Sequence, residues 1–307
     1  MKHKRKLKKG IKTLFILVIG IIILKYAYPY LNDIEIDSNG SIIIDDNIST
    51  NESSSNNNNN NNNYVDDSTY DSVSSEKNNV GTIKERLKKL SKEDSRINEI
   101  LDNYNDYPEA LLDMLSRNIK MTDFVLDYPE KKGKIFSETI GKVKKGTFPL
   151  LLQWDSRWGY GKYGDDNVAI GGCAPTALSM VIAGLTGKNN ITPYDVAKYS
   201  EKDGHYLSGT GTSWSLMTLG SKHFGVEGKE LPLTKNNIYN ALESGKPIIC
   251  SMRKGDFTTV GHFIVLVGIK DGKIKINDPN SEERSSILWE YERIESQIKN
   301  LWVFSAI

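Results

Sequence analysis

The second half of the sequence predicts an α+β domain in which helices come first and antiparallel strands follow. Residues 172–187 place apolar side chains at helical spacing and end on a glycine, as helices commonly do. Residues 261–269 and 273–278 are two apolar-rich runs joined through an Asp-Gly pair, which is the pattern of a β-hairpin. Residues 247–252 form a shorter apolar run and predict a buried strand.

Weaker patterns complete this domain, which we place at residues 147–307. A last strand is expected near residues 301–305. Three further helices are indicated by apolar spacing, by a proline in the first turn or by a glycine after the last turn. These helices are expected at residues 192–199, 213–224 and 236–243.

The start of the chain has the pattern of an export signal. Seven lysines and arginines precede residue 13, and an uninterrupted apolar run then extends from Thr13 to Leu24. The run is short for a spanning helix, which takes about 20 residues, but flanking lysines and tyrosines can extend it. We expect residues 1–31 to form an uncleaved membrane helix with a cytoplasmic N-terminus and an extracellular remainder. The alternative is a secreted protein released by signal cleavage.

Two segments separate this start from the predicted domain. Residues 32–81 contain the asparagine run 56–63 among serines and aspartates, a composition that predicts a disordered linker. Residues 82–135 place apolar side chains at three- and four-residue spacing and predict a helical accessory segment that ends at Pro129. This segment is either a spacer or a pro-segment or substrate-gating subdomain.

The composition excludes several classes of function. The net charge is +1, so nothing in the overall charge predicts a nucleic-acid partner. Two cysteines and four histidines are too few for a disulfide scaffold or a histidine-rich metal site. The composition gives no reason to expect a histidine-rich metal site, and attack by a cysteine thiolate needs no metal and no organic cofactor. Of the two cysteines, Cys250 lies in an apolar run and is expected to be a core residue.

Cys173 is the candidate nucleophile. It follows Gly171 and Gly172 and begins the first predicted helix of the domain. The unpaired N–H groups and the dipole at a helix start stabilise a thiolate, and the glycines leave room for a substrate backbone. On these neighbours alone, a buried and inert cysteine is an equal alternative.

His262 and Asp278 are the candidate base and the residue that orients it. His262 opens the first strand of the predicted hairpin, and Asp278 ends the second. A carboxylate beside an imidazole fixes the tautomer and orientation of the ring. A capped surface histidine and an ordinary Asn-Asp-Pro turn are the alternatives.

The hairpin register decides whether these two side chains can meet. With a plain two-residue turn, Asp278 faces Val265 and points away from the face of His262, because strand side chains alternate. With a three-residue loop whose glycine is left-handed, Asp278 faces Ile264 and Asn280 faces His262. We predict the three-residue loop.

Four motifs together resemble a known family. They are Gln153-Trp-Asp-Ser-Arg-Trp158, Gly171-Gly-Cys-Ala-Pro-Thr176, Gly261-His-Phe263 and Asn277-Asp-Pro279. Their order and neighbours resemble the papain-like cysteine peptidases related to the bacteriocin-processing, double-glycine leader peptidases, over residues 147–307. The gap between the Gln and Cys motifs is longer than in the leader peptidases proper and matches extended relatives with a Gln-x-Asp-x-Arg-Trp opening. That difference argues against leader processing.

The resemblance implies a papain-like fold and roles for individual residues. In such peptidases the cysteine is the nucleophile, the histidine the base, the aspartate its orienter, and the glutamine an oxyanion donor. These roles carry over to Cys173, His262, Asp278 and Gln153. The substrate is expected to be a peptide or protein, with secreted or cell-wall peptides as candidates. Residues expected to line the substrate groove are Gly172, Trp154, Trp214, Gly261 and Asn280.

Two other functions stay open at this point. An acyltransferase would use the same thioester intermediate, with an amine in place of water. A non-catalytic binding domain could retain the fold without the chemistry.

Overall fold

The computed structural model describes residues 35–36, 42–43 and 81–307. In the first of its two units, residues 1–66, the short strands β1 (Glu35–Ile36) and β2 (Ile42–Ile43) pair antiparallel, within the segment predicted as a linker. The expected membrane helix at residues 1–31 and the rest of that linker lie outside the described residues. No helix among the described residues is long and apolar enough to cross a membrane.

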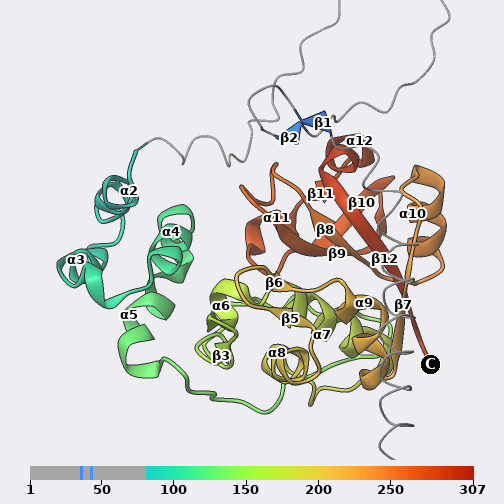
Figure 1. Ribbon diagram of the computed structural model, residues 1–307, viewed down its shortest axis with the longest axis horizontal. Coiled ribbons are helices and arrows are strands. Elements are labelled where there is room, and N and C mark those ends of the chain that lie inside the picture. Colours follow the sequence, from blue (N-terminus) through green and yellow to red (C-terminus); the bar gives the residue numbers. More distant parts are fainter. Residues whose placement is uncertain (1–34, 37–41, 44–80) are drawn as a thin grey trace, which may run out of the picture. The chain divides into compact units, whose positions relative to one another are not determined.

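Four helices form the accessory segment of the second unit (Figure 1). Thr82 caps the first of them in a capping box with Glu85. Pro129 does not end the series as predicted, because it lies within the last turn of α5. Proline lacks a backbone N–H, but the next turn still closes, since Lys132 N–H donates to Tyr128 O at 2.9 Å. The helices are α2 (Ile83–Leu90), α3 (Ile97–Asp102), α4 (Glu109–Arg117) and α5 (Thr122–Lys131), with 3-10 turns at Tyr104–Asp106 and Ile119–Met121.

Of the four helices predicted in the main domain, three are continuous and one is not, and the short helices at Val168–Gly171, Glu282–Ser286 and Tyr291–Ile294 were not predicted. The expected helix at residues 213–224 is broken into α9 and a 3-10 turn, η3, so that prediction was wrong in its continuity. At the break, a Cβ on Gly220 would lie 2.9 Å from the His205 ring, which shows how tightly the chain packs there. The helices are α6 (Val168–Gly171), α7 (Cys173–Thr186), α8 (Pro193–Lys202), α9 (Ser215–Thr218), η3 (Gly220–Phe224) and α10 (Lys235–Glu243).

A six-stranded antiparallel sheet forms the second part of the domain, in the order β11-β10-β9-β8-β12-β7. Neither edge strand was predicted, because Val-Glu-Gly-Lys-Glu of β7 is mostly polar and β11 has only two residues. The strands are β7 (Val226–Glu230), β8 (Ile248–Met252), β9 (His262–Lys270), β10 (Lys273–Asn277), β11 (Leu288–Trp289) and β12 (Ile298–Ala306). The shorter elements are β3 (Lys162–Tyr163), β4 (Asp166–Asn167), β5 (Tyr206–Leu207), β6 (Gly211–Thr212), α11 (Glu282–Ser286) and α12 (Tyr291–Ile294).

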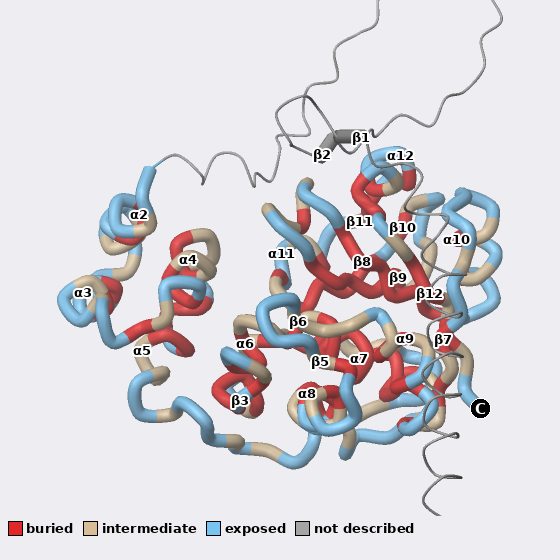
Figure 2. The backbone as a smooth tube through the Cα atoms, viewed as in Figure 1, coloured by how far each residue is buried: buried red, intermediate tan, exposed pale blue. Residues whose placement is uncertain are grey.

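The sheet separates two apolar cores, and its central strand β8 and the first half of β9 are buried on both faces (Figure 2). Alternation along β9 shows the division, because Phe263 and Val265 join the core that includes α7, whereas Ile264 and Leu266 join the core that includes α10. Cys250 of β8 is fully buried in the second core and is not in a disulfide, as expected of a core residue. The helices-then-sheet order confirms the predicted α+β class.

The turn of the β9–β10 hairpin differs from the prediction. Lys270 pairs with Lys273, so the loop has two residues rather than three. Asp271 and Gly272 have φ of 52° and 74°, and positive φ at both central positions is what a type I′ turn requires. The three-residue loop was therefore wrong, because the Asp-Gly pair itself satisfies the tighter turn.

A β-bulge farther along the hairpin nevertheless restores the register that the site needs. Lys275 pairs with Gly268 but Ile276 pairs with Leu266, so β9 contributes one extra residue, Val267, to the ladder. Beyond the bulge Asn277 faces Val265. The next residue, Asp278, therefore falls on the same face as His262, as predicted, although by a different device.

Candidate active site

Cys173 is the first residue of α7, at the point where the chain leaves the short helix α6. Gly172 is the residue that caps α7, with φ −92° and ψ 17°, and an added Cβ there would lie 2.6 Å from Val168 Cγ1. Close packing against α6 therefore requires glycine at position 172. Contact between Gly172 and the substrate stays a prediction. As the first helical residue, Cys173 has a backbone N–H with no partner within α7.

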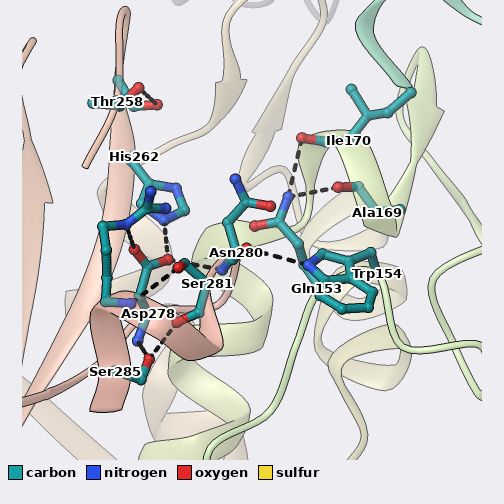
Figure 3. A network of polar contacts seen from close by, with 12 residues as sticks. Gln153, Trp154, Ala169, Ile170, Thr258, His262, Asp278, Asn280, Ser281 and Ser285 are labelled. Atoms are coloured by element: carbon teal, nitrogen blue, oxygen red, sulfur yellow. Dashed lines mark hydrogen bonds and ion pairs between the residues drawn. The ribbon is translucent and has the colours of Figure 1, made fainter. Parts of the chain in front are cut away.

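His262 and Asp278 form a buried pair (Figure 3). Nε2–H of His262 donates to Asp278 Oδ1 at 2.7 Å, and the two side chains are 8% and 0% exposed. Cys173 lies close enough to the same imidazole to contribute to its raised pKa. Because Nε2 is taken by the carboxylate, Nδ1 is the ring nitrogen left to serve the thiol. The structure thus brings together the three residues predicted as nucleophile, base and orienter.

Asp278 is held by more than the histidine. Its Oδ1 also accepts from Asn280 N–H at 2.7 Å, and its Oδ2 accepts from Arg284 Nε at 2.6 Å. The backbone N–H of Asp278 donates to Ser285 Oγ at 2.8 Å. A fully buried carboxylate with this many donors is fixed in orientation, so it can hold the imidazole in a single pose.

These contacts shift the protonation of the buried pair. Burial lowers the pKa of His262. The charge and hydrogen bond of Asp278, with a smaller contribution from Cys173, raise it by more than burial lowers it, to about 9. Burial raises the pKa of Asp278, but the charges of His262 and Arg284 hold it below its usual range. The pair is therefore an imidazolium and a carboxylate at neutral pH, and its ionic form is lost as the pH rises through about 9.

Gln153 lies on the loop that precedes α6 and is 3% exposed. Its Nε2 donates to Ala169 O at 2.6 Å and makes a longer contact of 3.4 Å with Ile170 O. Two carbonyl oxygens can face only the NH₂ group, so the amide orientation is determined. One hydrogen is committed to Ala169, whereas the long contact leaves the second weakly held. Its predicted role as oxyanion donor stays a prediction.

The loop that carries Gln153 is tied to the loop that carries Asp278. Gln153 N–H donates to Pro279 O at 2.7 Å, and Trp154 Nε1 donates to Asn280 O at 3.2 Å. In the view of Figure 3 the Asn280 side chain lies between His262 and Gln153. The side-chain oxygens of Gln153 and Asn280 are buried without a hydrogen-bond partner among residues 81–307.

The other predicted groove residues differ in their surroundings. Gly261 is exposed next to His262, and its carbonyl accepts from Thr258 Oγ1 at 3.1 Å. Trp214 is 38% exposed and packs edge-on against Trp302. Its aromatic and cation–π partners among residues 81–307 are Trp302 and Lys299, and neither belongs to the Cys173, His262 and Asp278 group. Substrate contact by these residues stays a prediction.

Sequence patterns did not reveal three of the supporting residues. Arg284 and Ser285 lie on α11. An Arg-Ser pair after an Asp-Pro turn has no recognisable pattern in the sequence, and only the fold brings these residues to Asp278. Tyr163 of β3 also lies near the start of α7, because a Cβ on Gly171 would be 3.6 Å from its ring. Burial raises the pKa of Tyr163 to about 12. Its hydroxyl hydrogen-bonds Ser200 and Thr212.

Replacing Gly172 with alanine tests the packing at the start of α7. The new methyl group collides with Val168, so we expect the free energy of unfolding to fall by about 1–3 kcal/mol. The matched control is Gly268→Ala, because a Cβ at 268 meets nothing within 4 Å, and its change should stay within about 0.5 kcal/mol. Urea unfolding of both variants gives the comparison, and equal midpoints would contradict this account of Gly172.

Comparison with solved structures finds similar chains at low identity. A chain from Bacillus anthracis described as a C39-like peptidase is 15% identical, with a TM-score of 0.37, and the match covers 54% of this chain and 98% of that one. The peptidase domain of Streptococcus ComA, described as a bifunctional ABC transporter involved in a quorum-sensing pathway, is 18% identical, with a TM-score of 0.36 and coverage of 52% and 100%.

Comparison with protein families gives the assignment. No curated protein matches the chain significantly. The profile of the Peptidase_C39 like family, in contrast, matches residues 145–305, slightly more than half of the chain and nearly the whole of the domain predicted at 147–307. That span includes the glutamine, cysteine, histidine and aspartate motifs. The chain therefore belongs to the Peptidase_C39 like family.

Proposed function

We propose that this protein is a cysteine peptidase or amidase that hydrolyses an amide bond through Cys173, His262 and Asp278. The observation that carries the proposal is the 2.7 Å hydrogen bond from His262 Nε2 to the buried Asp278, on an imidazole whose pKa the nearby Cys173 also helps to raise. A thiol, an imidazole and a carboxylate linked in this order are what nucleophilic attack on a carbonyl needs. Membership of the peptidase family supports the same reaction class.

The proposed reaction has two halves. In the first, Cys173 has given its proton to His262 Nδ1, and its thiolate Sγ bonds to the carbonyl carbon of the substrate while the carbonyl oxygen takes up the electron pair as an oxyanion. When the carbon–nitrogen bond breaks, the proton on His262 Nδ1 moves to the departing amine. In the second half, water attacks the thioester, His262 accepts a proton from that water, and the acid product leaves as the Cys173 thiolate returns.

Two donors are proposed for the oxyanion. The backbone N–H of Cys173 starts α7 and is free of a helical partner, and the weakly held second hydrogen of Gln153 Nε2 is the side-chain donor. Removing one such donor typically lowers kcat by about 10²–10³. Arg284 would not touch the substrate in this mechanism. It holds Asp278 at 2.6 Å and is therefore a positioning residue.

Loss of the thiol should abolish hydrolysis. We expect Cys173→Ala to remove all cleavage of a mixed peptide library followed by mass spectrometry, because no other cysteine can replace the nucleophile. Cys250→Ala is the matched control and should retain cleavage, since Cys250 is fully buried in the core. Iodoacetamide should likewise modify Cys173 alone in the folded protein. Cleavage that survives Cys173→Ala would refute the proposed mechanism.

We further propose that the domain acts outside the cytoplasmic membrane. The support comes from the sequence, in which seven cations precede the apolar run Thr13–Leu24. A membrane-impermeant maleimide added to intact cells should then label Cys173, with the Cys173→Ala chain as the control for labelling elsewhere. Labelling that appears only after the cells are lysed would place the domain in the cytoplasm.

A further inference from the structure

The accessory helices and the catalytic domain share one apolar core. The side chains that α2 to α5 bury are packed together with Tyr160 and Ala169, and with Trp154 and Ile170 at its margin, all from the segment between Gln153 and Cys173. The helices contribute the following fully or almost fully buried side chains: Leu87, Ile97, Ile100, Leu111, Leu112, Leu115, Met121, Phe124 and Val125.

Two aromatic rings stack on each other in this shared core. Phe124 of α5 and Tyr160 stack with their centroids 4.1 Å apart and their planes 3° from parallel. The Tyr160 hydroxyl donates to Phe124 O at 3.2 Å, and both rings are at least 95% buried. Farther along, Gly133 N–H donates to Tyr160 O at 2.8 Å, so the chain leaving α5 continues the same contact.

Phe124 also reaches the backbone that holds the Gln153 amide. A Cβ on Gly159 would lie 2.7 Å from Phe124 Cε2 and 3.0 Å from Gln153 O, so the ring presses directly against this turn. Gly159 O accepts from Ala169 N–H at 3.0 Å, and Ala169 O accepts from Gln153 Nε2 at 2.6 Å. A continuous series of contacts therefore leads from the α5 ring to the proposed oxyanion donor.

A second connection between the two parts is electrostatic and weaker. Lys120 pairs with Glu282 of α11 at 2.9 Å, but both side chains are about half exposed, and such surface pairs contribute little to stability. Among residues 81–307, the side-chain partners of Asp278 are His262, Asn280 and Arg284, none of them from the accessory helices. The helices thus support the glutamine side of the site and not the carboxylate.

We propose that the accessory segment Ile83–Lys131 is a positioning element for the Gln153 amide, acting through Phe124, Tyr160 and Ala169. This inference rests on the proposed function for its kinetic consequence, but its structural part can be tested without activity. It differs from a flexible spacer and from an inhibitory pro-segment, because removing the helices would expose the buried Tyr160 and Ala169 and release the turn that orients Gln153.

The test compares two phenylalanines on the same tyrosine in the full chain. Phe124→Leu removes the ring that stacks on Tyr160, whereas Phe136→Leu removes a 53% exposed ring that meets Tyr160 edge-on at 6.2 Å. In ¹⁵N-labelled protein, Phe124→Leu should shift or broaden the Gln153 side-chain amide signals, and Phe136→Leu should leave them unchanged. Unchanged Gln153 signals in a folded Phe124→Leu protein would overturn the proposal.

A double-mutant cycle provides the kinetic readout. We expect Phe124→Leu to lower kcat about five- to twenty-fold with little change in KM, and to change kcat less than two-fold when Gln153→Ala is already present. The same factor in both backgrounds would show that the ring acts elsewhere and would overturn the proposal. The rate at which iodoacetamide modifies Cys173 should be the same in both leucine variants, which excludes general loss of folding.

The two proposals fail in different ways. A wild-type protein without Cys173-dependent cleavage would refute the peptidase, while the Gln153 amide signals would still decide the positioning role. Normal cleavage by a chain that lacks residues 82–131 would refute the positioning role alone.

Discussion

The hydrogen bond between His262 and Asp278 is the interaction on which the arrangement of the site depends. His262 begins β9 and Asp278 directly follows β10, its neighbour in a six-stranded sheet, and the two meet only if these strands pair in one particular register. A single extra residue at Val267 sets that register. Asn280 N–H and Arg284 then donate to the carboxylate, and Ser285 Oγ accepts from the backbone N–H of Asp278. All three follow Asp278 within seven residues, so the sheet and the segment after it place and hold the pair together.

The rest of the site is attached to this pair from a separate part of the domain. Cys173 arrives on α7, which packs on the face of the sheet lined by Phe263 and Val265. The Gln153 loop is joined to the Asp278 loop by the hydrogen bond from Gln153 N–H to Pro279 O. The accessory helices support that loop from behind through the core around Tyr160. Three segments distant in sequence thus depend on one another for the geometry of one reaction.

Much of this could be predicted from the sequence, for identifiable reasons. Long periodic segments such as α7 and β9 were predicted nearly to their ends, because buried side chains repeat there with a clear period. The residues of a short segment were less informative where packing against the rest of the domain decides the local backbone structure. The Asp271-Gly272 pair is compatible with two loops, and the bulge at Val267 has no turn residues to indicate it. The break between α9 and η3, and the helical Pro129, likewise depend on packing.

The supporting residues of the site show the same limit. Gln153, Cys173, His262 and Asp278 could be selected because their neighbours match a family pattern. Arg284 could not, because its importance comes only from the fold, which brings its guanidinium to a buried carboxylate. The support given by Phe124 was equally invisible, since an aromatic residue in an amphipathic helix predicts a core contact but not which loop it contacts.

Titration of the His262 imidazole by NMR tests the central claim most directly. The account predicts a midpoint near pH 9 in the wild-type protein, because Asp278, with a smaller contribution from Cys173, outweighs the burial of the ring. In Asp278→Asn the burial remains and the charge is gone, so the midpoint should fall to or below the ordinary 6.5. The control Glu282→Gln removes an exposed carboxylate of the same loop and should leave the midpoint near 9. A wild-type midpoint at or below 6.5, or one that Asp278→Asn does not change, would contradict the account.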